Sequence, residues 1–133
     1  MHTMTENILR WDCGGENAES IEEYLNAGSD RGRIKRLIIM PGGSAAFASW
    51  GKENAFVKQL SEENPGMLLT HLWMNEGKGT CGNYHWQDGR IVADDTPTSE
   101  TELAGLIQKI KQEIVRAEEH DLDDFSQDDL GMR

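Results

Sequence analysis

A series of short apolar runs, separated by turn residues, does most to limit how this chain can fold. The runs contain β-branched or aromatic residues and are bounded by Gly, Pro, Asn or Asp, a pattern typical of buried strands. They fill the middle of the chain, from Arg36 to Ala93, as Leu37–Met40, Ser44–Trp50, Met67–Met74 and Tyr84–Ala93. We therefore expect this stretch to form a sheet.

The runs and the turns between them carry more specific information. Leu37–Met40 is apolar at odd and even positions, which predicts a central strand buried on both faces. The Pro41-Gly42-Gly43 segment after it predicts a tight turn, because Pro presets one backbone angle and Gly accepts a positive φ. Asp88-Gly89 predicts a two-residue type I′ hairpin, with Tyr84 and Trp86 on one face of the preceding strand.

A helical signal precedes the sheet. Ser20 stands three positions before Glu23, as in a capping box, and Asn17 is an alternative, earlier cap. Gly28 is expected to end this helix, since glycine adopts the left-handed conformation that stops a helix without strain. A short first strand, Ile8 to Trp11, is expected before it.

A second helix is expected after the sheet. Ser99 and Glu102 form another capping box, and the helix should reach about Glu118 and lie across the sheet. Its apolar stripe has helical spacing and consists of Leu103, Ile107, Ile110 and Ile114.

The whole chain, residues 1–133, is expected to be a single α+β domain. It should hold a mainly antiparallel sheet of four to six strands with an N-terminal and a C-terminal helix, and loosely ordered ends over residues 1–7 and 119–133. Residues 53–61 fit two structures equally. Phe56, Val57 and Leu60 suit a helix started by Asn54, and the same residues suit a strand.

Charge limits the partners. The chain has 24 acidic and 13 basic residues, a net charge of −11. Affinity for a phosphate backbone comes from Lys and Arg, so direct nucleic-acid binding is disfavoured. The same negative field speeds association with a basic protein.

Cysteine usage and hydropathy favour the cytoplasm. Two cysteines, Cys13 and Cys81, are too few for a disulfide scaffold, and no charged segment followed by an apolar one opens the chain. The longest apolar runs fall short of the length that a membrane span needs, so no membrane partner is expected.

Candidate reactive groups gather around Cys81. His85 follows it by four positions and His71 lies in the preceding strand, so these residues could form part of a zinc site, or His85 could activate the thiol as a nucleophile. The simpler interpretation is that Cys81 is a small apolar side chain in a loop, and no cofactor is expected. The aromatic residues Trp50, Trp73, Trp86 and Tyr84 suit either a core or the centre of an interface.

The order of these elements resembles a known group of proteins. The resemblance spans residues 18 to 116 and rests on the helix from Ser20 to Leu25, the Leu37–Ile39 strand, the Gly42-Gly43 turn, Tyr84-x-Trp86 with Gly89, and the helix from Ser99. It is similar to the acidic α+β immunity proteins that bacteria encode beside polymorphic toxins, especially those paired with deaminase-type toxins. The resemblance implies a cytosolic inhibitor that covers the active site of its cognate toxin. A helix at 53–61 would depart from this pattern.

We therefore expect a non-catalytic inhibitor of a basic toxin that acts on nucleic acid, working as a monomer or weak dimer. Two alternatives remain: an inhibitor of a host nuclease that mimics DNA charge, and a small thiol enzyme using Cys81 and His85. The residues expected to bind the partner border strand ends and turns, and they are Trp50, Glu53, Glu62, Glu63, Glu76, Asp88, Asp94 and Asp95.

Overall fold

The computed structural model describes residues 4–11, 17–51 and 54–131, with side chains described for residues 4–11, 18–51 and 54–120. Its elements follow the order β1 (Thr5–Trp11), α1 (Asn17–Asp30), β2 (Lys35–Met40), β3 (Ser44–Ser49), α2 (Asn54–Glu63), β4 (Leu69–Asn75), β5 (Thr80–Gln87), β6 (Arg90–Asp94) and α3 (Glu100–Gly131). The six strands form one antiparallel sheet in the order β2-β3-β1-β4-β5-β6. The predicted α+β class is confirmed.

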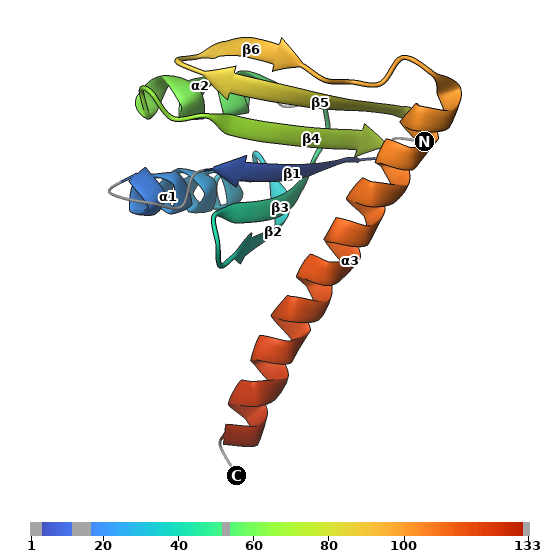
Figure 1. Ribbon diagram of the computed structural model, residues 1–133. Helices are drawn as coiled ribbons and strands as arrows, with labels where there is room; N and C mark the ends of the chain where they lie inside the picture. Colours follow the sequence, from blue (N-terminus) through green and yellow to red (C-terminus); the bar gives the residue numbers. More distant parts are fainter. Residues whose placement is uncertain (1–3, 12–16, 52–53, 132–133) are drawn as a thin grey trace.

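The first six elements form a recognisable unit. β3 lies between β1 and β2, and β1 lies between β3 and β4, so α1 and α2 each connect two parallel strands that are separated by a third. This is the split βαβ arrangement of ferredoxin-like folds. β5 and β6 extend the sheet by hairpins beside β4, and α3 crosses the face opposite α1 and α2 (Figure 1).

Aromatic residues fill the space between the sheet and the α1/α2 layer. Strand alternation directs Leu9 of β1 to this face, where Phe47 of β3 and Phe56 of α2 meet with ring centroids 5.9 Å apart. The Tyr24 ring packs on Phe56 at 4.7 Å, and its hydroxyl donates a hydrogen bond of 2.7 Å to the Phe56 carbonyl. These contacts join α1 to α2.

Smaller aliphatic residues fill the space between the sheet and α3. The predicted stripe of Leu103, Ile107, Ile110 and Ile114 packs here against Ile8, Ala46, Leu72 and Met74. The amide of Glu102 donates to Ser99 Oγ at 3.2 Å, which confirms the capping residue. α3 continues to Gly131, past the expected end near Glu118.

Local turn signals gave correct predictions. Gly42 and Gly43 have φ values of +89° and +84° in the turn between β2 and β3. Asp88 and Gly89 have φ values of +52° and +79°, the pair of left-handed residues that a type I′ hairpin requires. β1 covers the predicted Ile8–Trp11 strand and begins earlier, at Thr5.

Three predictions for residues 17–40 were wrong. α1 begins at Asn17, so Ser20 lies inside the helix and is not its cap. Gly28 also lies inside α1, where a Cβ would stand 2.5 Å from the Phe56 ring; Gly32, with a φ of +74°, follows the helix instead. The Leu37–Met40 run belongs to β2, which is an edge strand and not a central one. It is apolar on both faces because α1 packs on one face and α3 on the other.

Within the ambiguous segment at 53–61, the described residues 54–61 are helical. α2 covers Asn54–Glu63 and buries Phe56, Val57 and Leu60 against the sheet. The order of elements therefore departs from the pattern on which the resemblance to immunity proteins was drawn.

Candidate partner-binding surface

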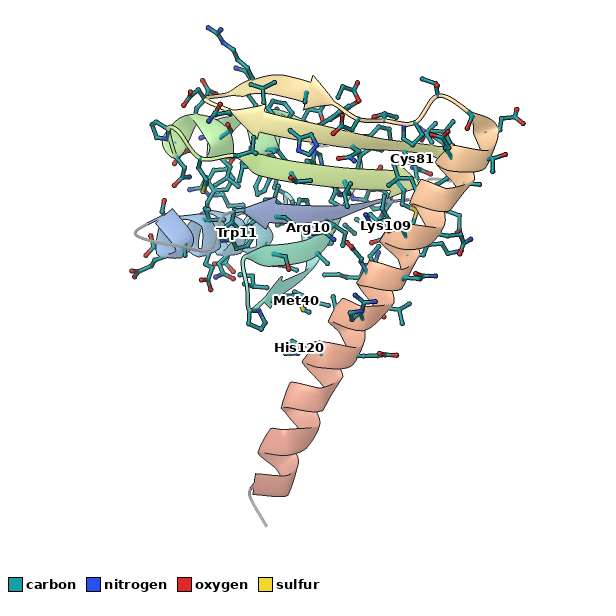
Figure 2. All side chains as sticks on the ribbon, viewed as in Figure 1. Arg10, Trp11, Met40, Cys81, Lys109 and His120 are labelled. Atoms are coloured by element: carbon teal, nitrogen blue, oxygen red, sulfur yellow. The ribbon has the colours of Figure 1, made fainter. Side chains whose placement is uncertain are left out.

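The structure does not bring Cys81 and His85 together. They lie four residues apart on β5, which separates them by about 13 Å along the strand. Cys81 is buried beneath the first turns of α3 (Figure 2), with its Sγ 3.6 Å from the Leu103 carbonyl oxygen. Burial raises the pKa of this thiol, which disfavours the reactive thiolate. His85 is therefore out of reach as its activating base.

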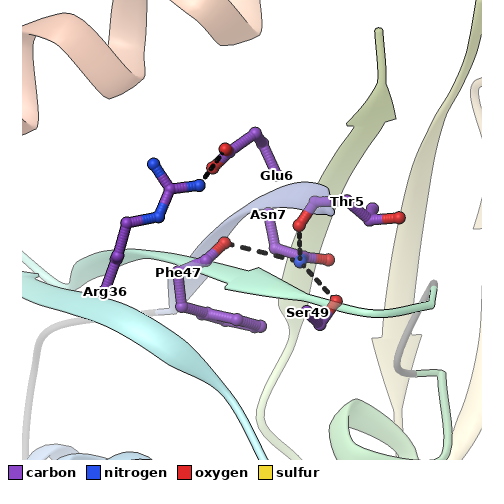
Figure 3. A network of polar contacts seen from close by, with 6 residues as sticks. All are labelled: Thr5, Glu6, Asn7, Arg36, Phe47 and Ser49. Carbon is purple, nitrogen blue, oxygen red and sulfur yellow. Dashed lines mark hydrogen bonds and ion pairs between the residues drawn. The ribbon is translucent and has the colours of Figure 1, made fainter. Parts of the chain in front are cut away.

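His71 belongs to the opposite face of the sheet, where it is buried and joins a polar network around Asn7; Figure 3 shows the Asn7 part of this network. The Asn7 amide nitrogen donates to the carbonyl oxygens of Thr5 and Phe47 and to Ser49 Oγ. Asn7 Oδ1 is thus the acceptor for His71 Nε2 at 2.8 Å, which fixes the proton on Nε2. Burial lowers the pKa of His71 to about 3, so the ring is neutral near pH 7. Its role is to hold β4 against β1.

The proposed zinc ligands thus lie on two faces of the sheet. Within the described side chains, no three or more His, Cys, Asp or Glu residues are placed to hold a metal ion. Cys13 lies outside the described residues.

A chain of three polar side chains, not foreseen from the sequence, runs across β4, β5 and the segment after β6. Thr70 Oγ1 lies 3.2 Å from His85 Nδ1, and His85 Nε2 lies 2.8 Å from Asp95 Oδ2. Hydrolases use a hydroxyl, an imidazole and a carboxylate in this order. Here, however, Thr70 lies in a strand paired on both sides, where the ladders occupy the backbone N–H groups that an oxyanion would need. The contacts among these three side chains orient His85 and Asp95 on the sheet.

The predicted partner-binding residues fall into three separate places. Trp50, which is 64 % exposed, and Glu76 lie at the end of the sheet where β3 and β4 finish. Glu76 forms an ion pair of 2.5 Å with Lys111 of α3. Glu53 lies outside the described residues.

Three other predicted residues lie at the opposite end of the sheet, where Glu62 contacts the hairpin and Glu63 faces the groove between α1 and α2. Glu62 and Glu63 end α2, and Asp88 heads the β5–β6 hairpin next to it; we call these three residues the acidic corner. A Cβ added to Gly89 would clash with the Glu62 side chain, so only glycine allows this close approach of helix and hairpin. All three carboxylates are exposed.

Hydrogen bonds fix the acidic corner in place. The Gly89 amide donates to Ser61 Oγ at 2.9 Å, and the Gly66 amide donates to Asp88 Oδ1 at 2.8 Å. The Gln87 side-chain amide donates to the Gly66 carbonyl at 3.1 Å. The backbone of the corner and the Asp88 carboxylate are therefore held in place before a partner binds.

The acidic corner has a negative potential at its surface. Glu62 and Glu63 stand at the C-terminus of α2, where the helix dipole is negative, and no basic residue occupies the last turn. Lys58 lies 3.5 Å from Glu62, and both side chains are more than half exposed. A basic partner would be attracted to this negative potential.

The remaining predicted residues, Asp94 and Asp95, lie at the C-terminal end of the edge strand β6. Hydrogen bonds from the Thr96 side chain and amide lower the pKa of the Asp94 carboxyl, and Asp95 pairs with His85. All five residues of β6 are exposed, including the apolar Ile91 and Val92. This strand continues the surface that begins at Asp88.

Comparison with family models, curated proteins and solved structures finds no match to this chain. Among the described residues, no helix combines the length and the apolar character that crossing a membrane requires.

Proposed function

We propose that this chain is a non-catalytic inhibitor of a basic protein toxin. The toxin is of the deaminase or nuclease type and acts on nucleic acid. Such a toxin carries positive charge where it holds the phosphate backbone, and an acidic protein can occupy that track. Because α2 is a helix where the resemblance to immunity proteins expects none, the order of elements is not the basis of this proposal. Its basis is the chemistry of the surface.

The acidic corner is the observation that carries the proposal. Glu62, Glu63 and Asp88 are exposed. Hydrogen bonds hold Asp88 and the backbone that joins the hairpin to α2, and the negative end of the α2 dipole adds to the potential of the two glutamates. Exposed carboxylates on a fixed backbone are suited to binding a cationic surface. The net charge of −11 acts in the same direction over a longer range.

The two alternatives receive less support from the geometry. A thiol enzyme requires Cys81 and His85 within hydrogen-bond reach, and they are not. A DNA mimic requires carboxylates along one face, whereas the predicted acidic residues within the described part occupy three separate places.

Co-expression with candidate toxins encoded near the gene tests the proposal. We expect one of them to be neutralised and to co-purify as a complex whose affinity falls as salt rises. A variant with Glu62→Gln, Glu63→Gln and Asp88→Asn should bind it with an association rate constant lower by about tenfold at low salt.

A matched control removes the same charge elsewhere. Asp30→Asn, Glu118→Gln and Glu119→Gln neutralise three exposed acids away from the acidic corner, and this variant should bind nearly as fast as the unchanged protein. Failure of every candidate toxin to be neutralised, or equal slowing by the two variants, would remove the proposal.

A further inference from the structure

The two edge strands of the sheet are protected to different extents. In β2, the residues from Leu37 to Met40 are half-buried, because α1 and α3 pack on its two faces. In β6, all five residues are exposed, and the side chains of Ile91 and Val92 are 42 % and 53 % exposed. Figure 1 shows β6 as the outer strand of the sheet on the side away from β2.

An exposed edge strand presents backbone N–H and C=O groups to which another strand can bind. Register shifts occur in the pairing of both β2 and β6, so an irregular ladder does not distinguish the two edges. Coverage does. We infer that β6 is a docking strand, and that an extended segment of the basic partner adds beside it to continue the sheet.

The charges around β6 define the chemistry of that segment. Asp88 precedes the strand, Asp94 and Asp95 stand at its other end, and the apolar Ile91 and Val92 lie between. Arg90 is the one basic residue among positions 88 to 95. A segment with apolar residues at its centre and Lys or Arg at both ends would match this order.

A second copy of the chain fits the strand less well. Antiparallel pairing of two β6 strands would bring Asp88, Asp94 and Asp95 of each copy toward the same three acids, with a single Arg90 from each copy to offset them. Each copy also carries a net charge of −11. The charge balance therefore favours a basic segment of another protein, and the inference rests on the proposed function, for which it specifies how the partner binds.

A synthetic peptide tests strand addition directly. The probe is a blocked Lys-Val-Thr-Val-Thr-Lys peptide, and binding is followed by the backbone amide signals of the protein in NMR spectra. We expect the largest shifts at residues 91–95. Methylation of alternate peptide nitrogens keeps the charge but removes backbone donors, and it should weaken binding by about tenfold. A peptide with Glu in place of Lys should not bind.

A pair of variants separates strand addition from general attraction. Val92→Lys places a cation on β6, whereas Thr101→Lys adds the same charge at an exposed position in the first turn of α3. The Val92→Lys variant should bind the peptide about tenfold more weakly, because like charges then oppose each other. The Thr101→Lys variant should bind almost as the unchanged protein does.

Several outcomes would overturn the inference. These are an unbound peptide, shifts confined to the acidic corner, insensitivity to N-methylation, or a stable dimer of the free protein that Val92→Lys dissociates. The Val92→Lys variant could still capture a toxin that the variant with the neutralised acidic corner does not. That result would overturn strand addition and leave the proposed function intact. If no toxin is captured while the peptide binds as expected, the proposed function fails and β6 remains a docking strand.

Discussion

The two faces of the sheet are covered in different ways. The α1/α2 layer meets the strands with interlocking aromatic rings, whereas α3 crosses the other face with aliphatic side chains. Grooves occur on both faces, with volumes of about 390 Å³ and 280 Å³ at α1 and α2 and of about 320 Å³ and 120 Å³ beside α3. The ion pairs from α3 to Arg10 and Glu76 involve partly exposed side chains. The α1/α2 face buries the larger cluster of side chains, with most of the aromatic rings, so we expect it to hold more of the packing energy than the α3 face.

Neighbouring residues of β1 give the sharpest test of this contrast. Leu9 is fully buried under α1 and α2, and Ile8 is directed toward α3 beside the smaller groove. Leu9→Ala should lower the free energy of unfolding by about 4 kcal/mol, because the fitted layer cannot collapse into the cavity. Ile8→Ala should cost about 2 kcal/mol, since α3 can shift and the groove can widen. Urea unfolding followed by circular dichroism measures both; equal losses would contradict the contrast.

Two helical glycines offer a comparison between α1 and α3. Gly28→Ala would press a methyl group into the Phe56 ring and should cost about 1–3 kcal/mol. Gly105 of α3 has open space around it, so Gly105→Ala should raise stability by about 0.5–1 kcal/mol through helix propensity. Thermal unfolding should shift in opposite directions for the two variants, and a shift in the same direction would show that Phe56 moves aside.

The buried histidine on the α1/α2 face should make stability depend on pH. His71 has a pKa of about 3 in the folded protein and about 6.5 in the unfolded chain. Between these two pH values the unfolded chain binds more protons than the folded protein, so stability falls as the pH falls. The neutral ring stabilises the fold above pH 6.5, and about 2 kcal/mol should be lost between pH 7 and pH 5. His71→Gln should remove that part of the slope in urea unfolding at several pH values. An unchanged slope would mean that other groups cause it.

Sequence patterns were reliable where a few neighbouring residues decide the structure. The Asp88-Gly89 hairpin and the Ser99 cap depend on backbone angles and hydrogen bonds within one turn, and both were correct. The Leu37–Met40 run was misplaced because a pattern of burial on both faces does not say what covers each face. Helices above and below an edge strand leave the same pattern as a central position in a sheet.

The candidate surface was predicted only in part for a related reason. Strand ends could be recognised from turn residues, but sequence does not say which ends meet. Asp88 lies beside Glu62 because the split βαβ order brings the end of α2 to the β5–β6 hairpin. Glu76 follows the end of β4 and so lies at the opposite end of the sheet. Thr70 and His85 are cross-strand partners, a relation that appears only once the register of β4 and β5 is known.

The order of the elements along the chain has a consequence for synthesis on the ribosome. The ferredoxin-like unit is complete at Asn75, but the helix that covers its second face is made only later, through about Ala117. At 5–20 residues per second, those roughly 40 residues take about 2–8 seconds to add. During that interval Ile8, Leu72 and Met74 stay open to water, so the nascent domain passes through a stage in which chaperones can bind it.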